Sequence, residues 1–188
     1  MYDSEIFKLI NRQPHMKKHF KGFYARDTLP PFTSSDLQHT FCIIINTDLV
    51  GEAGEHWILF YWDSKLKLAH FLDPLAQPLQ EEFQKWMQCC NTIVLLSHPV
   101  QHHLSVLCGL FVLYFMYYLC AGQAISDIVN RFSNTKLRLN DQLVSHFAKQ
   151  KLLYTPPLYK QDRKHVTRKN VADWMSRKSI DLWLHKER

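Results

Sequence analysis

The longest apolar stretch of the chain runs from residue 104 to residue 122 and contains no charged side chain. Its length is near the minimum for a helix that crosses a bilayer, so a membrane span is one interpretation. The alternative is a helix buried on all sides in a globular core. We favour the buried helix because expected strands and helices precede the stretch, and because Ser105, Cys108 and Gly109 lie near its start.

The remaining pattern predicts an α+β fold in which a central mixed sheet is flanked by helices. Continuous or alternating apolar runs predict strands, and a turn sequence over residues 63–65 predicts a hairpin between two of them. Apolar residues at helical spacing predict helices that pack on the sheet. The expected strands are residues 41–46, 56–62, 67–72 and 92–96; the expected helices are 3–11, 79–89, 124–132 and 139–147; residues 22–33 are expected to be a loop.

Cysteine usage places limits on the compartment. The chain has five cysteines, an odd number, with no Cys-x-x-Cys spacing. This argues against a disulfide framework and against a structural zinc site. The first residues are acidic and polar and show no secretory signal. We therefore expect a reducing compartment, the cytosol or the nucleus.

The net charge of +6 is unevenly distributed along the 188 residues. Residues 1–150 have 13 Lys/Arg and 13 Asp/Glu, whereas residues 151–188 have 10 and 4. We predict one domain over 1–150 and a basic helical segment over 151–188 that packs on it. A docked helix with a solvated basic face explains this segment, and so does nonspecific binding to a phosphate backbone. A membrane surface is a weaker alternative. The candidate DNA-binding residues are Lys160, Arg163, Lys164, Arg168, Lys169, Arg177 and Lys178.

Five residues form a pattern typical of thiol catalysis. A thiol attacks a carbonyl as a thiolate, and Cys108 lies at the expected start of the buried helix, where the helix dipole favours a negative sulfur. Gly109 leaves the backbone beside it open to a substrate. The expected hairpin would bring His56, a candidate base, next to Asp73, a candidate orienting acid. The amide of Gln101 and the backbone amide of Cys108 are candidate oxyanion donors.

Each of these residues also has an ordinary structural explanation. A histidine beside Trp57 at a strand start is usually structural, an aspartate before a proline often ends a strand, and a cysteine in an apolar run is usually a core residue. The joint order favours catalysis: His-Trp, an acid 17 residues later, then Gln-x6-Cys-Gly. We expect Trp57 to pack against the His56 region and to exclude water from it.

The histidine-rich loop before Cys108 raises a second question. His98, His102, His103 and Cys90 could be considered metal ligands, and His102 or His103 could compete as the base. A loop with several histidines is more often solvated, and no carboxylate stands close to them in the sequence. We therefore predict no metal site and no small-molecule cofactor.

The order of these residues resembles the clan of adenovirus maturation proteases and SUMO-specific proteases. The adenovirus-type protease, also found in polinton-like elements, is the nearer likeness. Residues 20–27 and 42–47 resemble its N-terminal loop and first core strand, and the resemblance extends over about residues 3–150. It differs in the acid, where adenoviral members often have Glu, and in His102 and His103. The matching positions are His56-Trp57, Asp73, Gln101 and Cys108-Gly109-Leu110-Phe111.

The resemblance implies a papain-like fold of the adenain and SUMO-protease type and a thiol endopeptidase. The substrates would be structural precursor proteins of a virus or mobile element, cut beside glycine during particle maturation. DNA and an activating peptide would be the cofactors, and Cys90 could form a disulfide with that peptide, although a buried structural cysteine also explains Cys90. The location would be the virion and host nucleus for a viral protein, and otherwise the cytosol or nucleus. The alternatives are a ubiquitin-like or SUMO-specific protease and a non-catalytic, membrane-anchored or nucleic-acid-binding protein.

Overall fold

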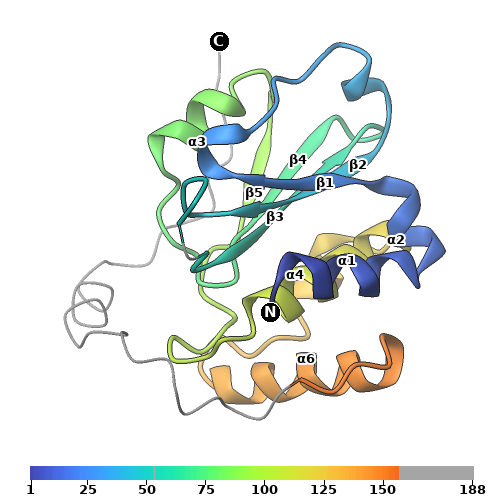
Figure 1. Ribbon diagram of the computed structural model, residues 1–188, viewed down its shortest axis with the longest axis vertical. Helices are drawn as coiled ribbons and strands as arrows, with labels where there is room; N and C mark the ends of the chain where they lie inside the picture. Colours follow the sequence, from blue (N-terminus) through green and yellow to red (C-terminus); the bar gives the residue numbers. More distant parts are fainter. Residues whose placement is uncertain (53, 157–188) are drawn as a thin grey trace.

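A five-stranded mixed sheet forms the centre of the computed structural model, which describes residues 1–52 and 54–156 (Figure 1). The strands lie in the order β1-β2-β3-β4-β5. The two outer pairs are parallel and the two inner pairs are antiparallel. All four expected strands and the α+β class are confirmed. The strands are β1 Phe20–Ala25, β2 Phe41–Asn46, β3 Trp57–Asp63, β4 Leu68–Leu72 and β5 Ile93–Leu95.

One strand was not predicted, because residues 22–33 were expected to form a loop. The first part of that segment belongs to β1, which pairs in parallel with β2. β1 lies at the edge of the sheet and its residues are only partly buried, without an alternation of buried and exposed positions. A strand of this kind has neither the continuous apolar run nor the period of two that reveals a strand in a sequence.

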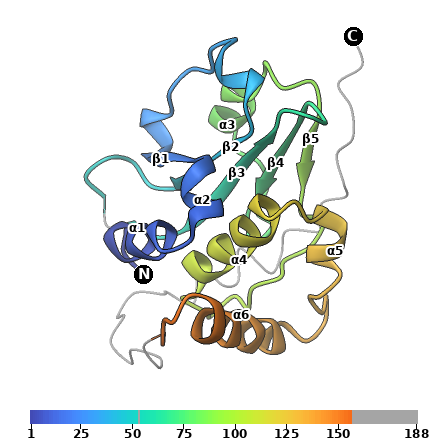
Figure 2. The same cartoon turned by 90° about the vertical axis from the view of Figure 1, so that its right-hand side faces the viewer.

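Helices cover both faces of the sheet (Figures 1 and 2). α3 lies on one face, and α4, α1, α2 and α6 lie on the other. The four expected helices are present: α1 has the expected ends, the other three have shifted ends, and the short α2 was not predicted. The helices are α1 Asp3–Asn11, α2 Pro14–His19, α3 Glu81–Trp86, α4 Cys108–Cys120, α5 Ile125–Val129 and α6 Leu137–Lys151; the 3-10 turns are η1 Arg26–Thr28 and η2 Asp36–Gln38.

Most of the apolar stretch over residues 104–122 forms α4. Every residue from Cys108 to Met116 is buried. The helix packs on β3 and against α1, α2, α5 and α6, so it lies between the sheet and a helical layer (Figure 2). Residues 104–107 precede the helix as a loop. Within the described residues, no helix is long and apolar enough to cross a membrane.

The two faces of the sheet contain separate apolar cores. Along β2, Cys42 and Ile44 pack in the core that contains α4, whereas Ile43 and Ile45 pack in the core that contains α3. This alternation follows from the two-residue period of a strand. The nucleophile candidate Cys108 is the first residue of α4, which packs in the first core, and so the α4 face positions the site.

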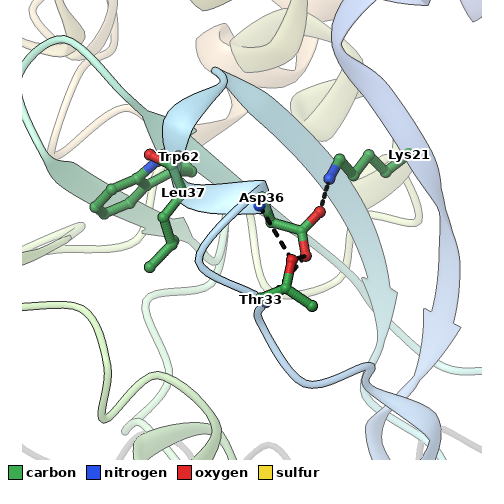
Figure 3. A network of polar contacts seen from close by, with 5 residues as sticks. All are labelled: Lys21, Thr33, Asp36, Leu37 and Trp62. Carbon is green, nitrogen blue, oxygen red and sulfur yellow. Dashed lines mark hydrogen bonds and ion pairs between the residues drawn. The ribbon is translucent and has the colours of Figure 1, made fainter.

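A loop between β1 and β2 closes the α3 face of the sheet. The Trp62 indole donates a hydrogen bond to the Leu37 carbonyl at 3.0 Å. Asp36 accepts hydrogen bonds from the Thr33 amide at 3.0 Å and from its hydroxyl at 2.6 Å, and forms an ion pair with Lys21 (Figure 3). These contacts fix η2 against β1, on the face that does not contain α4.

Candidate active site

The hairpin of β3 and β4 places the candidate base beside the candidate acid. The strands are antiparallel, with Leu59 opposite Leu72. The residue just before β3 and the residue just after β4 therefore lie at the same end of the sheet. His56 Nε2 is 2.6 Å from Asp73 Oδ1, and both side chains are buried. The predicted pairing of His56 with Asp73 is confirmed in the geometry.

The carboxylate of Asp73 is itself held by backbone donors. Oδ1 accepts a hydrogen bond from the Leu75 amide at 2.8 Å, and Oδ2 accepts one from the Gln77 amide at 2.9 Å. These bonds satisfy a carboxylate that is only 5% exposed. They also fix its rotamer, so that Oδ1 faces the imidazole.

Cys108 is the first residue of α4 and is buried. Its thiol is hydrogen-bonded to the His56 ring, and the Trp57 backbone N–H donates to the same sulfur. Because Asp73 occupies Nε2 of His56, Nδ1 is the ring nitrogen left for the thiol. The position at a helix start adds the favourable dipole expected from the sequence.

The ionisation of the pair follows from these contacts. Burial disfavours the imidazolium, but the charge and hydrogen bond of Asp73, with the contact to Cys108, outweigh it and raise the pKa of His56 to about 10. Burial also disfavours the thiolate, yet the hydrogen bond and charge of His56 and the Trp57 N–H lower the pKa of Cys108 below its ordinary value. The two shifts together favour a thiolate–imidazolium pair.

Trp57, the first residue of β3, directly follows the candidate base His56. Its indole Nε1 donates to the Met1 carbonyl at 3.1 Å, and its ring meets the Phe23 ring at a centroid distance of 5.9 Å. These contacts join β3 to the N-terminal residues and to β1. The exclusion of water from the His56 region by Trp57 stays a prediction.

The role expected for Gly109 needs a correction. A Cβ at this position would lie 3.1 Å from Met1 Sδ and 3.3 Å from Ile6 Cδ1. The space over Gly109 is therefore filled by the N-terminal residues and is not open to a substrate. The glycine allows α1 to approach α4 closely, which sequence spacing could not reveal.

Gln101 lies on the loop between β5 and α4 and is 1% exposed. Its backbone amide donates to the Pro74 carbonyl at 3.0 Å, next to Asp73. Its side-chain Nε2 donates to the Ser105 carbonyl at 2.8 Å, three residues before Cys108. The first bond connects Gln101 to the acid and the second orients its amide on the loop that leads to the nucleophile.

The other candidate residues lie elsewhere. The ring centroids of His102 and His103 lie 4.4 Å apart in a stacked arrangement, and the base contact to Cys108 is made by His56.

Cys90 is buried in the core that contains α3, whereas Cys89 is exposed. Burial, with Cys89 beside it, raises the pKa of Cys90 to about 12. Residues 1–52 and 54–156 contain no group of three metal-ligating side chains. The basic candidates from Lys160 to Lys178 lie outside the described residues.

Two buried polar residues of the site region were missed in the sequence. Asn140 and Asp141 are 2% and 6% exposed and contact the loop that contains Gln101. In the sequence they stand in an amphipathic segment, where polar residues normally mark the solvated face. No local signal distinguishes them, because their partners on that loop are about 40 residues away.

Comparison with known proteins supports the resemblance to adenovirus-type proteases. The protease of human adenovirus B serotype 3 is 29% identical over 115 residues, which cover 53% of this chain and 50% of that protein. The chain thus spans about half the length of the curated relative it matches. No family model matches the sequence.

Two solved structures show partial likeness. The ASFV protease matches with a TM-score of 0.42 and 15% identity over 54% of this chain and 42% of its own. A SUMO protease with its catalytic cysteine oxidised to a sulfenic acid matches with a TM-score of 0.40 and 15% identity, over 78% of this chain and 76% of its own.

Proposed function

We propose that the chain is a cysteine endopeptidase, a hydrolase in which Cys108 is the nucleophile and His56 the base. One observation supports this most directly: a buried imidazole lies between the Asp73 carboxylate and a thiol at the start of a buried helix. A structural histidine needs no thiol partner with a lowered pKa. Perturbed pKa values in such a group are typical of catalytic sites.

The mechanism follows from the ionised pair. The Cys108 thiolate attacks the scissile carbonyl carbon and forms a tetrahedral oxyanion. The Gln101 side-chain amide and the Cys108 backbone N–H donate hydrogen bonds to that oxyanion. The His56 imidazolium then gives its proton to the leaving amine, and a thioester remains. Water, deprotonated by His56, attacks the thioester and releases the acid and the thiol.

Asp73 contributes orientation and charge stabilisation. Its hydrogen bond to Nε2 leaves Nδ1 facing the sulfur, and its charge stabilises the imidazolium. Two backbone amides also donate to the carboxylate and hold its rotamer. The triad thus needs no rearrangement between acylation and deacylation.

The substrate class is proposed from the adenoviral relative. Structural precursor proteins of a virus or mobile element, cut beside glycine during maturation, are the expected substrates. DNA and an activating peptide are the proposed cofactors, with residues 151–188 as the DNA-binding segment. The burial of Cys90 favours a structural cysteine over a disulfide with that peptide. The proposed location is the virion and the host nucleus.

Alkylation and cleavage test this proposal together. Low iodoacetamide at pH 6–7, followed by mass spectrometry, should label Cys108 first in the native protein and slowly in His56→Ala. Exposed Cys89 is the internal control, because it is reachable but lacks a base. Labelling of Cys108 no faster than Cys89, even after DNA and candidate activating peptides are added, would contradict the proposal.

The substrate assay then separates two kinds of protease. Precursor-type peptides that contain glycine at the cleavage site are compared with ubiquitin-like tails that end in Gly-Gly. Cys108→Ala serves as the inactive control in both. Cleavage of the tails alone, without DNA or peptide, would replace the maturation protease with a ubiquitin-like or SUMO-specific one.

A further inference from the structure

Helix α6 holds the loop between β5 and α4 through one fully bonded side chain. Asn140 Nδ2 donates to the Val100 carbonyl at 2.8 Å and to the Ser133 carbonyl at 2.7 Å. Its Oδ1 accepts from the Ser133 amide at 2.8 Å. The side chain is 2% exposed, so these bonds operate where water does not compete. Asn140 thus fixes the residue immediately before Gln101.

The next residue of α6 holds the other side of Gln101. Asp141 Oδ1 accepts a hydrogen bond from the His102 amide at 3.4 Å, and the Ser105 side chain lies beside the same carboxylate, whose buried Oδ2 has no hydrogen-bond partner among the described residues. The two residues of α6 therefore hold the loop on both sides of Gln101. Burial of two adjacent polar side chains on one helix costs folding free energy unless their hydrogen bonds offset it.

The loop transmits this anchoring to the Gln101 amide. The Ser105 amide donates to the His102 carbonyl at 2.8 Å, which closes a tight turn. The Ser105 carbonyl then accepts from Gln101 Nε2 at 2.8 Å. A carbonyl partner fixes which end of the amide is the donor, since an oxygen there would face another oxygen. The orientation of the oxyanion donor thus depends on where Ser105 is held.

We infer that Asn140 and Asp141 are positioning residues for the oxyanion hole, which keep the Gln101 amide aimed at the developing negative charge. This inference rests on the proposed protease function. Neither residue needs to touch the substrate. Both act through backbone groups of the loop, because a preorganised donor contributes to catalysis only when it is already placed before the reaction.

The electrostatics of Asp141 agree with a role other than stability. Burial raises its pKa to about 6, although the His102 amide, the Ser105 side chain and Arg138 oppose the shift. Two ionisable groups face Asp141: Arg138 of the same helix and His102 of the loop. The pKa of His102 is lowered, chiefly by burial. At neutral pH the fold therefore keeps a carboxylate whose burial costs stability. Such a cost is typical of functional positions.

Two substitutions at Asp141 separate positioning from folding. Asp141→Ala removes the acceptor for the His102 amide and should lower kcat by about 10- to 100-fold with KM nearly unchanged. Asp141→Asn keeps an acceptor oxygen and should retain kcat within about threefold. Its melting temperature at pH 8 should equal or exceed that of the native protein by about 2–4 °C, because the buried charge is gone. Activities are expressed per Cys108 labelled by iodoacetamide.

A second readout isolates the oxyanion. A peptide aldehyde forms a hemithioacetal with Cys108 and needs the oxyanion donors, whereas iodoacetamide needs only the thiolate. Asp141→Ala should weaken aldehyde inhibition by the same factor as kcat and leave the alkylation rate unchanged. In a Gln101→Ala background, Asp141→Ala should have little further effect, because the donor it positions is missing.

The matched control is Ser145→Ala on the same helix. The Ser145 hydroxyl donates to the Asp141 carbonyl at 2.7 Å, within α6 itself, so its loss should leave kcat and aldehyde inhibition at native levels. Equal kcat per labelled site in Asp141→Ala and the native protein would overturn the inference. Additive losses in the double variant would overturn it as well. A native protein with slow labelling and no cleavage would instead refute the proposed protease.

Discussion

The two halves of the candidate site are built in different ways. His56, Asp73 and Cys108 stand at the ends of β3, β4 and α4, so regular hydrogen bonding of a sheet and a buried helix places them. Gln101 stands on a loop whose position depends on side-chain bonds from α6. The nucleophile and base thus depend on the main fold, whereas the oxyanion donor depends on a few polar contacts.

This difference separates two measurable properties. Ionisation of the thiol depends only on His56, Asp73 and Cys108, the half of the site built on β3, β4 and α4. The rate of alkylation measures this ionisation. Turnover needs both halves. Variants of the loop half should therefore uncouple alkylation from turnover, and variants of the other half should lower both.

Removal of the base gives the largest expected effect. His56→Ala should lower kcat/KM by about 10⁴- to 10⁶-fold, by analogy with other catalytic triads. The rate of Cys108 alkylation at pH 6 should fall by about 10²- to 10³-fold, because burial then favours the neutral thiol. Initial rates of cleavage and of labelling measure the two losses. Retained labelling at pH 6 would show that another group ionises Cys108.

The same pair predicts the pH dependence of stability. A raised His56 pKa contributes stability that is fully present below about pH 6.5 and is lost as the pH rises through about 10. A lowered Cys108 pKa contributes stability that is present above about pH 9 and is lost as the pH falls. The two slopes oppose each other below about pH 9, so the profile of melting temperature should be flattened there and should fall between about pH 9 and 10, where only the His56 slope remains. Thermal unfolding of Cys108→Ala should lack the flat region.

The acid should have the next largest effect. Asp73→Asn should lower kcat by about 10²- to 10⁴-fold, because the amide stabilises the imidazolium poorly and can present the wrong group to Nε2. Its backbone partners Leu75 and Gln77 also lose a charged acceptor. We expect slower alkylation at pH 6 together with slower turnover, measured on the same preparation. Unchanged alkylation would assign Asp73 to loop structure alone.

The loop half gives the third effect. Gln101→Ala should lower kcat by about 10²-fold, the loss typical of one oxyanion donor. Alkylation of Cys108 should keep its native rate, because the thiol contacts are intact. Gln101→Glu is a useful comparison, since it preserves size but places a negative group near the oxyanion. A parallel fall in alkylation and kcat would mean that the two halves are not separate.

The smallest effect of a substitution is expected far from both halves of the candidate site. Lys21→Ala removes the ion pair to Asp36 on the β1–β2 loop (Figure 3). The pair lowers the pKa of Asp36, but both side chains are partly exposed, so solvent screening limits its contribution to about 0–1 kcal/mol. Urea unfolding should show this small loss, and kcat should be native. A clear loss of kcat would show that the α3 face also contributes to catalysis.

The sequence was informative wherever a local pattern determines geometry. The apolar runs revealed β2 and α4, and the turn between β3 and β4 was enough to predict that His56 meets Asp73. Predictions from the sequence were wrong where contacts between distant residues determine the structure. The edge strand β1 has no burial pattern, and Gly109 is required by the approach of Met1 and Ile6 rather than by a substrate. The identity of residues 151–188 as a DNA-binding segment stays a prediction.

The burial of α4 has a consequence for how activity is lost. Its first nine residues are enclosed between the sheet and other helices. Most of its amides can therefore exchange hydrogen with solvent only when the whole fold opens. The Cys108 amide is a first-turn amide without a partner inside the helix, but the residue is held in place by the same enclosed helix. Inactivation by heat or denaturant should follow global unfolding, without an earlier fraying of the nucleophile's own segment.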